Sequence, residues 1–410
     1  MNAVIKDTTN TPHSEVFEKL WTLDHPELGT DPVSTEPLLS PEYFERERDL
    51  VFRRSWLNVG REGQIPNPGD YFVQEVAVCN TSVILVRGKD GTIRGFHNVC
   101  MHRQTKLVWD SKGTCGGFRC KYHGWSYSTD GRLVGIPDED QFFDSFEKSE
   151  NGLLPVTTDI WEGFIYINLE PNPKETLREF LGEMGERLSG YPFKELSTCY
   201  AYSGVLNANW KTGMYAFNEV YHLAFVHAAS GGESLVPKEN RYGRPLWVGL
   251  GSRHHTNTVG GSSNFKMTPV EAIAARHGPT VSQGAIGSLP GTNPSQHPNF
   301  ALDINVIFPN HFVDTFQGTY FTYNFWPISV DKTYYEMRTY YAPPKNAAER
   351  FAQEFSRVWF RDILLEDLEV IEHSQQGLAS GVRTELHLQD SEVCVRHHLK
   401  VVDDHVAQRV

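Results

Sequence analysis

The sequence predicts an α+β fold in which an all-β domain precedes a larger domain built from an antiparallel sheet and a long C-terminal helix. Two patterns lead to this prediction. Between residues 56 and 169, apolar residues recur with a period of two, and Gly-containing turns separate the short strands. A second such region, 301–341, is followed at 346–377 by apolar residues at helical spacing, with Phe351, Phe355, Val358 and Trp359 on one stripe.

Composition narrows the possible functions. The formal net charge of −13 argues against nucleic acid as a main partner. No apolar run approaches the ~20 residues that cross a membrane. The first ten residues lack the basic start and apolar core of a secretory signal. We therefore expect a cytoplasmic protein without a membrane partner, whose six cysteines are not paired in disulfides.

Three segments are predicted along the 410 residues, a length that suits two or three domains. Residues 1–45 contain five prolines and form an N-terminal segment that packs on the C-terminal domain, with a mobile start. Residues 46–165 form the all-β domain, and residues 166–410 the C-terminal domain. A helix is predicted at 40–52, with Ser40 as its N-cap and Pro41 in its first turn.

The all-β domain presents two loops that contain a cysteine and a histidine. Its strands are predicted at 71–78, 82–87, 92–96 and 155–169, and the segment 113–118 leads to the second loop. The loops contain Cys100 with His102 and Cys120 with His123. Zinc fingers usually pair like residues, so a zinc knuckle is the less favoured alternative. Mixed pairs suit a cluster with two unlike irons, one held by the cysteines and one by the histidines, which is the Rieske [2Fe–2S] arrangement. Cys115 is expected to be an ordinary loop or core residue.

The residues around these pairs resemble the cluster loops of the Rieske non-haem iron oxygenases. The matching segments are 98–103, 120–127 and 130–133. The sequence lacks the additional cysteines of respiratory Rieske proteins, and Gln104 stands where the oxygenases usually have Gly. Several basic residues gather near the loops: Arg103, Lys106, Lys112, Arg119, Lys121 and Arg132. They could form a docking patch for an acidic electron donor, or an ordinary solvated surface.

A second candidate metal site lies in the C-terminal domain. Within a predicted helix that follows Asn209-Trp210-Lys211, Glu219 and His222 would share a face. His227 could join His222 on one metal if the helix ends or tightens between them. Two histidines and a carboxylate form the facial triad of non-haem Fe(II) oxygenases.

The carboxylate is left open by spacing alone, because five acidic residues lie between 362 and 372. The family resemblance implies Asp367 as the ligand, with Glu366 as the fallback. It also implies that Glu219 bridges the two metal centres, although the family usually has Asp there. Glu at this position is known in a smaller branch that acts on alkylamines. The adjacent pairs His254-His255 and His397-His398 are expected to lie on the surface.

Other elements of the C-terminal domain follow in order. A helix is predicted at 175–188, a strand at 200–206 and a short helix at 269–276, within a Gly- and Pro-rich segment, 253–300, that could border a substrate pocket. The family resemblance implies a helix-grip (START-like) fold, with the 301–341 meander wrapped around the long helix.

The resemblance implies a function as the terminal oxygenase (alpha) component of an aromatic-ring-hydroxylating or dealkylating system. Such a chain holds a Rieske [2Fe–2S] cluster and mononuclear Fe(II), and it uses O₂ on a small hydrophobic, aromatic substrate. The sequence contains no Gly-x-Gly-x-x-Gly motif, so a separate flavin reductase, ferredoxin or both must deliver electrons from NAD(P)H. The family pattern also implies a homotrimer, in which the cluster of one subunit serves the iron of the next through Glu219.

Three reactions or roles remain open. N- or O-dealkylation by monooxygenation is slightly favoured by Glu219. Ring hydroxylation, including cis-dihydroxylation, is the alternative within the family. An electron-transfer or ligand-binding protein without oxygenase activity, or a zinc-dependent scaffold, is the alternative from another class.

Overall fold

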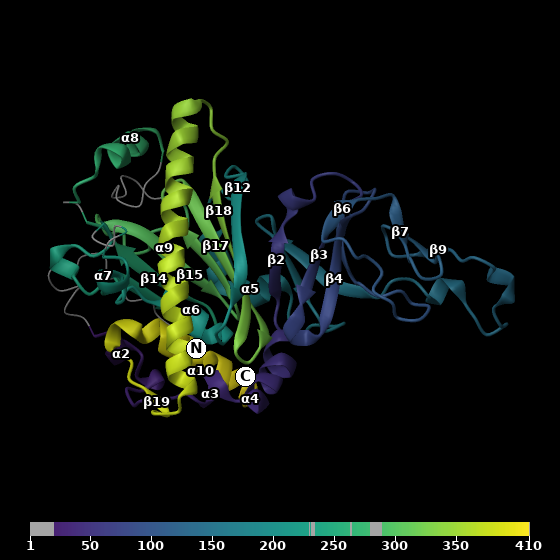
Figure 1. Ribbon diagram of the computed structural model, residues 1–410, viewed down its shortest axis with the longest axis horizontal. Helices are drawn as coiled ribbons and strands as arrows, with labels where there is room; N and C mark the ends of the chain where they lie inside the picture. The colour runs from purple at the N-terminus through teal and green to yellow at the C-terminus, as the bar shows by residue number, and fades with distance from the viewer. Residues whose placement is uncertain (1–19, 229, 231–233, 263–264, 279–288, 410) are drawn as a thin grey trace. The chain divides into compact units, whose positions relative to one another are not determined.

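The computed structural model describes residues 20–228, 230, 234–262, 265–278 and 289–409. These residues form two compact units (Figure 1). One comprises Arg48–Phe180, and we call it the cluster-binding unit. The other combines the described residues up to Glu47 with those from Leu181 onward, and we call it the catalytic unit. The predicted α+β class is confirmed. The predicted mobile start and part of the 253–300 segment lie outside the described residues.

The cluster-binding unit is built from two antiparallel sheets. The larger has the strand order β2-β11-β10-β5-β4-β3-β6, and the smaller has the order β7-β8-β9. The strands are β2 (Leu57–Arg61), β3 (Asp70–Val76), β4 (Thr81–Arg87), β5 (Ile93–His97), β6 (Lys112–Thr114), β7 (Gly117–Arg119), β8 (Ser126–Ser128), β9 (Leu133–Gly135), β10 (Pro155–Trp161) and β11 (Phe164–Asn168). The first Cys–His loop follows β5, and the second joins β7 to β8, so each loop is anchored by strands.

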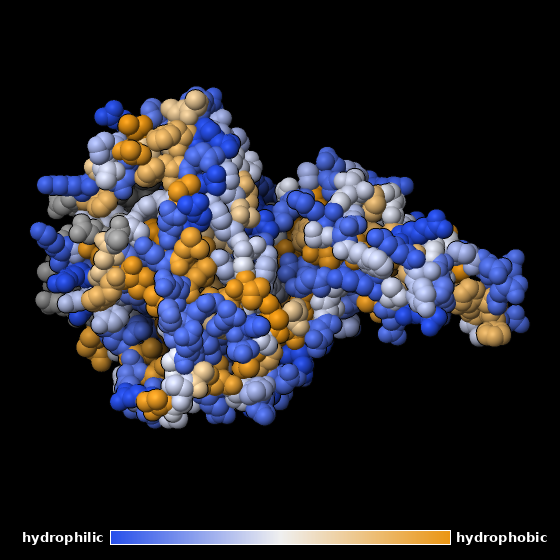
Figure 2. Space-filling view, in the orientation of Figure 1, coloured by the Kyte–Doolittle hydropathy of each residue, from blue (hydrophilic) through white to orange (hydrophobic). Residues whose placement is uncertain are grey.

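A segment between β9 and β10, residues 136–154, packs against the core of this unit. Phe142 and Phe146 from this segment contact the ring of Trp125, with centroids 5.7 and 5.6 Å apart. Their neighbour Phe143 is 87% exposed. Figure 2 shows a small hydrophobic group on the surface at the end of the unit beyond β9. The contacts of these two partly buried rings with Trp125 therefore hold the segment beside the second loop.

The catalytic unit is an antiparallel sheet covered by helices. Among its described residues, the strand order is β12-β18-β17-β16-β15-β14-β13. The strands are β12 (Thr198–Leu206), β13 (Trp247–Leu250), β14 (His255–Gly260), β15 (Phe300–Ile307), β16 (His311–Thr315), β17 (Thr319–Ser329) and β18 (Lys332–Tyr341). The helices outside the N-terminal segment are α6 (Trp210–Asn218), α7 (Leu223–Val226), α8 (Pro269–His277), α9 (Ala347–Ala379) and α10 (Val393–Val406). Helix α5 (Leu177–Leu188) leads into this unit.

Helices α6 and α9 pack against one face of the sheet, and α9 runs along it as the helix-grip prediction requires (Figure 1). Residues that pair directly across strands share a face. The pairs Phe312↔Tyr323 and Tyr323↔Met337 therefore define the helix-covered face. Phe217 of α6 contacts Tyr323 on this face, with centroids 5.0 Å apart. On α9, the hydroxyl of Ser356 lies 3.1 Å from that of Tyr341.

The first described residues pack on the C-terminal part of the same unit. Strand β1 (Val33–Ser34) pairs with β19 (Glu385–Leu386). The backbone amides of Trp21 and Thr22 donate to Asp390, and Arg396 of α10 donates to the Asp31 carbonyl. The helices of this segment are α2 (Trp21–Asp24), α3 (Glu36–Leu39) and α4 (Pro41–Glu47), and a π-helical turn continues to Phe52. Ser40 caps α4 as predicted, because its hydroxyl accepts from Tyr43 N.

Three sequence-based expectations were wrong. The paired histidines His254-His255 and His397-His398 are not on the surface: all four are at most 6% exposed. Strand β14 occupies part of the Gly- and Pro-rich segment 253–300, in which only a short helix was predicted. The apolar stripe predicted for α9 is also misplaced, because Phe351 is 42% exposed, while the buried positions include Ala352 and Ser356. The buried side of α9 also includes Leu364 and Ile371, further along the helix than the predicted stripe.

None of the helices in the described ranges combines the length and the apolar composition needed to cross a membrane.

Candidate metal centres

The two Cys–His loops of the cluster-binding unit share one backbone hydrogen-bond pattern. In the first, Cys100 N donates to Thr105 O (2.8 Å) and Gln104 N donates to Cys100 O (2.9 Å). In the second, Cys120 N donates to Trp125 O (2.8 Å) and Gly124 N donates to Cys120 O (3.0 Å). The two cysteines therefore occupy equivalent positions, each at the start of a tight turn.

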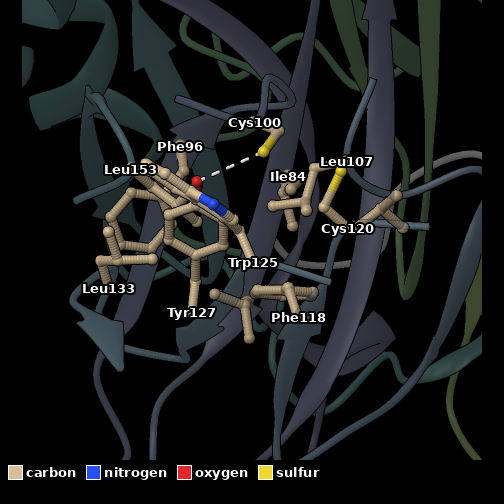
Figure 3. Close-up of a cluster of buried hydrophobic side chains, with 12 residues drawn as sticks. Ile84, Phe96, Cys100, Leu107, Phe118, Cys120, Trp125, Tyr127, Leu133 and Leu153 are labelled. Atoms are coloured by element: carbon tan, nitrogen blue, oxygen red, sulfur yellow. Dashed lines mark hydrogen bonds between the residues drawn. The ribbon is translucent and has the colours of Figure 1, made fainter. Parts of the chain in front are cut away.

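The cysteine side chains lie within the hydrophobic core of this unit. Cys100 and Cys120 are 1% and 3% exposed, and Figure 3 shows both sulfur atoms at one edge of the packed side chains. The Tyr127 hydroxyl lies 3.4 Å from Sγ of Cys100 and accepts from Met101 N. Burial raises the pKa of the Cys100 thiol. Tyr127 thus offers a polar contact to a sulfur atom in otherwise apolar surroundings.

The histidines lie nearer the surface than the cysteines. His102 and His123 are half-buried, and their Nδ1 atoms lie 3.1 Å apart. Two nitrogen ligands of one tetrahedral metal ion, each bonded at about 2.1 Å, lie about 3.4 Å apart. The His102 ring stacks on Trp125, with centroids 4.9 Å apart and planes 10° apart. Burial, and then the charges of His123 and Arg103, lower the pKa of His102, which favours the neutral imidazole that binds metals. The residues present therefore fit a [2Fe–2S] cluster with an inner cysteine iron and an outer histidine iron.

In the catalytic unit, Asn209-Trp210-Lys211 anchors the helix that leads to the second site. The Asn209 side chain caps α6 by accepting from Lys211 N at 3.0 Å. The Trp210 indole and the Lys211 ammonium both bond the carboxylate of Glu47, which is 0% exposed. Gln375 of α9 accepts from Asn209 N at 3.0 Å. This motif therefore ties α6 to α4 and α9.

The chain leaves the helix before the predicted ligands. Helix α6 ends at Asn218, and Glu219 is extended (φ −140°, ψ 170°). His222 and His227 flank the four-residue helix α7. The expectation that Glu219 and His222 share a helix face was therefore wrong, whereas the predicted break before His227 is observed. Short α7 turns the two imidazoles toward each other, with ring centroids 5.3 Å apart.

Asp367 of α9 meets both histidines. Its Oδ1 lies 3.4 Å from Nε2 of His222 and 2.9 Å from Nε2 of His227. One ligand atom from each residue lies within 4.8 Å of the others. Within the described residues, Nε2 of His227 and Oδ1 of Asp367 are buried without a hydrogen-bond partner. Three ligands at about 2.1 Å from one ion, at right angles, lie about 3 Å apart. These atoms thus fit a mononuclear metal ion, and the two histidines with one carboxylate suit iron.

Each histidine is oriented by a second carboxylate. Glu219 Oε1 accepts from Nδ1 of His222 at 2.6 Å, and Glu366 Oε2 accepts from Nδ1 of His227 at 2.7 Å. Carboxylates placed in this way fix the tautomer and turn Nε2 toward the metal. Glu366, the predicted fallback ligand, therefore lies on the other side of the His227 ring from Asp367. Sequence reasoning missed its orienting position, and the adjacent acids Glu366-Asp367 were the available signal.

The site is strongly electronegative. Burial opposes protonation of His222, but the adjacent carboxylates of Asp367 and Glu219 raise its pKa to about 10. Burial likewise opposes ionisation of Asp367, yet the two histidines keep its pKa below the ordinary value. The same field favours a bound cation.

A recess of about 520 Å³ opens beside these residues. Glu219, His222 and Asp367 form part of its wall. Apolar side chains of α9, such as Val370, line another part, and Glu392 lies close enough to Glu219 for the two charges to interact.

Comparison with protein families assigns both halves of the chain. Residues 193–408 match the family described as "Ring hydroxylating alpha subunit (catalytic domain)", which is more than half of the chain. Residues 55–155 match the family described as "Rieske [2Fe-2S] domain".

Individual proteins agree with these matches. The large oxygenase component of a naphthalene 1,2-dioxygenase system from Ralstonia sp is 29% identical over 344 residues, which cover 75% of this chain and 70% of that protein. A carnitine monooxygenase oxygenase subunit from Acinetobacter pittii is 29% identical over 202 residues, 48% of this chain and 53% of that protein. The crystal structure of a quaternary ammonium Rieske monooxygenase superposes with a TM-score of 0.72 at 21% identity, covering 90% of this chain and 94% of that one.

Proposed function

We propose a reaction for this chain on one premise: it belongs to the family of ring-hydroxylating alpha subunits that carry a Rieske [2Fe-2S] domain. It is an oxygenase component with a [2Fe–2S] cluster and mononuclear iron, and it works with separate electron donors. We propose that O₂ and electrons from NAD(P)H, delivered by a flavin reductase, a ferredoxin or both, are used to monooxygenate a small hydrophobic, aromatic substrate by N- or O-dealkylation.

One observation supports the assignment of the iron ligands. The unpaired, buried Nε2 of His227 and Oδ1 of Asp367 lie 2.9 Å apart, with Nε2 of His222 beside them. Buried polar atoms rarely lack partners, so a metal ion at this point accounts for them. Cys100, Cys120, His102 and His123 are the proposed cluster ligands.

The chain's own residues prepare the iron site for catalysis. The cluster supplies electrons one at a time, and bound Fe(II) supplies the reductive activation of O₂. Glu219 and Glu366 hold the Nδ1 protons of the two histidines, so that Nε2 of each stays free to bind metal. Glu219 also accepts from the backbone amides of Tyr221 and His222, which fixes its carboxylate beside the His222 ring.

Dealkylation is favoured over ring dihydroxylation by Glu219 and by two of the similar proteins. Their names describe a carnitine monooxygenase and a quaternary ammonium monooxygenase. In dealkylation, one oxygen atom enters the C–H bond next to nitrogen or oxygen. The resulting hemiaminal or hemiacetal breaks into an aldehyde and an amine or alcohol. The second oxygen atom leaves as water after taking up two electrons and two protons.

Ring cis-dihydroxylation is the second candidate, because another similar protein belongs to a naphthalene 1,2-dioxygenase system. It places both oxygen atoms of O₂ in the product and releases no aldehyde. Aromatic rings of Phe217, Phe312 and Tyr323 gather on the helix-covered face of the sheet, and Phe217 lies two residues before Glu219 in the chain. Aromatic contacts near the site suit an aromatic substrate in either reaction.

We also propose a homotrimer in which the recess beside Glu219 receives the cluster-bearing loops of the next subunit. A histidine of that cluster must reach Glu219, which lies in the wall of the recess. Acidic Glu392 lies close to Glu219, whereas Arg103 and Lys121 are exposed on the cluster loops, so the charges are complementary. A head-to-tail contact of this kind closes into a ring.

We propose that the electron donor is acidic. Fewer basic residues near the cluster loops are available to bind it than the sequence indicates. Two of the basic residues have acidic local partners, since Lys106 pairs with Glu75 and Arg132 with Asp130. Lys121 and Arg103 lie over the neutral rings of Trp109 and Tyr122 and keep their charge. A cytoplasmic location is part of this proposal, because NAD(P)H is the electron source.

A substrate screen with a surrogate reductase and ferredoxin tests the proposed reaction. Aromatic N- and O-alkyl compounds are incubated under ¹⁸O₂. The products are analysed by mass spectrometry for one or two labelled oxygen atoms and are assayed for aldehyde. A released aldehyde together with an unlabelled amine or alcohol supports dealkylation. One labelled atom retained without aldehyde supports ring hydroxylation, and two labelled atoms without aldehyde support dihydroxylation. A red-brown protein with cluster iron alone and no substrate-dependent NADH use would instead support an electron-transfer or ligand-binding role.

A further inference from the structure

The buried histidines His255 and His397 form a hydrogen-bonded pair that reaches toward the iron site. Nδ1 of His397, on α10, lies 3.2 Å from Nδ1 of His255, on β14. Nε2 of His397 lies 2.8 Å from the Gly251 carbonyl, and Nε2 of His255 lies 3.4 Å from the side chain of Asn218. Asn218 is the last residue of α6 and directly precedes Glu219. These contacts join the C-terminal helix to the end of α6.

The Gly251 carbonyl determines which atom donates in each contact from Gly251 through His397 and His255 to Asn218. A carbonyl oxygen only accepts, so His397 must donate from Nε2, and its Nδ1 then accepts when the ring is neutral. His255 must therefore donate from Nδ1, which leaves its Nε2 as an acceptor. Burial keeps both rings neutral, because it lowers the pKa of His397 to about 4 and that of His255 well below its ordinary value.

This direction decides how the Asn218 amide is oriented. Nε2 of His255 needs a donor, so Asn218 must present Nδ2 to it rather than Oδ1. With Oδ1 toward His255, Nδ2 is buried without a hydrogen-bond partner among the described residues. Reversing the amide turns a contact between two acceptors into a hydrogen bond, and amide orientation is set by such networks.

The end of α6 is thus held at two points by β14. The backbone carbonyl of Asn218 accepts from Nδ2 of Asn257 at 3.3 Å, and its side chain donates to His255. Asn218 is 0% exposed and His255 is 1% exposed. The next residue, Glu219, must then leave the helix in one direction, which brings its carboxylate to Nδ1 of His222.

We propose that Asn218, His255 and His397 are positioning residues that hold Glu219 in place for electron transfer to the iron. None of the three is a proposed metal ligand, and each acts through Asn218. This inference rests on the proposed function, because it takes Glu219 as the bridge between the two metal centres. It assigns a role to one histidine of each adjacent pair, His255 and His397, which the sequence pattern left without one.

The test measures reoxidation of the reduced cluster in the holoenzyme by stopped-flow absorbance, with O₂ as the probe. The variants are His255→Leu, His397→Leu and Asn218→Asp, which has the same size as Asn but offers no donor to His255. We expect each to slow reoxidation about tenfold or more. The half-saturating O₂ concentration, iron content and cluster absorbance should match the unsubstituted protein.

His398→Leu is the matched control. His398 lies next to His397 on α10, is equally buried, and bonds the Pro309 carbonyl at 2.9 Å rather than His255. It should lower the melting temperature as much as His397→Leu and leave the reoxidation rate unchanged. Equal slowing in both, or none in Asn218→Asp, would overturn the positioning role and leave a structural one.

A Glu219→Gln arm separates this inference from the function on which it rests. We expect Glu219→Gln to slow reoxidation severely with both metals retained. If that variant reacts at the full rate, the bridging role of Glu219 is wrong. If Glu219→Gln is slow while the His255, His397 and Asn218 variants are fast, only the positioning inference is wrong.

Discussion

Glu366 accepts a hydrogen bond from Nδ1 of His227 at 2.7 Å, while the next residue, Asp367, faces Nε2 of the same ring at 2.9 Å. Two adjacent acids on α9 thus contact both nitrogens of one histidine. The hydroxyl of Ser230 also donates to Glu366 Oε2, at 2.6 Å. This arrangement assigns different tasks to the two carboxylates, since one orients the ring and the other is placed to bind metal.

Removing the orienting carboxylate should weaken iron binding. Glu366→Leu leaves Nδ1 of His227 without its acceptor, and loss of such a partner lowers metal affinity about 10- to 100-fold. Iron retained after dialysis against graded chelator gives the affinity. Glu369→Leu is the control, because Glu369 is exposed three residues further along the same helix. Equal iron affinity in Glu366→Leu and Glu369→Leu would show that Glu366 does not orient the ligand.

Breaking the buried pair of Lys211 and Glu47 should destabilise the catalytic unit. Both side chains are 0% exposed and lie 2.5 Å apart. Lys211→Met leaves the Glu47 carboxylate buried with only the Trp210 indole as donor, which should cost about 3–5 kcal/mol. The double variant Glu47→Leu/Lys211→Met removes both charges and should recover most of that loss. Denaturant titration followed by tryptophan fluorescence measures both, and additive losses would contradict the pairing argument.

The sequence predicted those features that depend on local pattern. Alternating residues located the meander at 301–341, and Asn346 and the helical spacing located α9 almost to its ends. Mixed Cys–His spacing was enough to predict the first metal site, because the loop residues proposed to hold a cluster are close in sequence. The choice between Glu366 and Asp367 needed family knowledge, since a one-residue step turns a side chain by about 100° and only tertiary packing decides which one faces the histidines.

The sequence could not place the paired histidines. His255 and His397 are 142 residues apart, and their contact depends on how α10 packs against β14. The sequence suggests polar surroundings, because the charged residues Arg396 and Lys400 lie on either side of the second pair. The structure buries both rings because each imidazole finds a carbonyl or imidazole partner, which removes the main penalty for burying a polar group.

Stability should fall as the pH drops below about 6.5, in part because of His398. Burial lowers the pKa of His398 to about 4. The hydrogen bond to the Pro309 carbonyl raises this pKa, whereas the nearby charges of His397 and Lys211 lower it further. The folded state therefore binds fewer protons than the unfolded state between pH 6.5 and 4, so stability decreases as protons are added. At pH 5 the loss is on the order of 2 kcal/mol.

His398→Gln isolates this contribution. Glutamine can still donate to the Pro309 carbonyl but does not titrate, so its pH dependence should be flatter than that of the unsubstituted chain. The difference in unfolding free energy between the two proteins, measured by denaturant titration at pH 7 and pH 5, cancels the other titrating groups. A difference that does not change with pH would contradict the argument.

Filling the recess should distinguish subunit docking from substrate binding. Val370 lines the recess and is 43% exposed, so Val370→Trp adds bulk without disturbing the core. If the recess receives the next subunit, the trimer should dissociate in sedimentation velocity and turnover should fall with protein dilution. An intact trimer with a raised KM for the substrate would instead identify the recess as the substrate pocket.

Gln104 should be replaceable by the glycine usual in this family, with a small gain in stability. Its φ of 59° is left-handed, which costs a residue with a Cβ about 1–2 kcal/mol. Glycine avoids that strain but loses about 0.5–1 kcal/mol through greater freedom in the unfolded chain. Gln104→Gly should therefore stabilise the cluster-binding unit by up to about 1.5 kcal/mol, because the exposed side chain gives up no packing. Gln104→Val, which is β-branched, should release the cluster at lower denaturant. Visible absorbance against denaturant measures both, and a Gly variant that loses its cluster first would mean that Gln104 contributes more than backbone geometry.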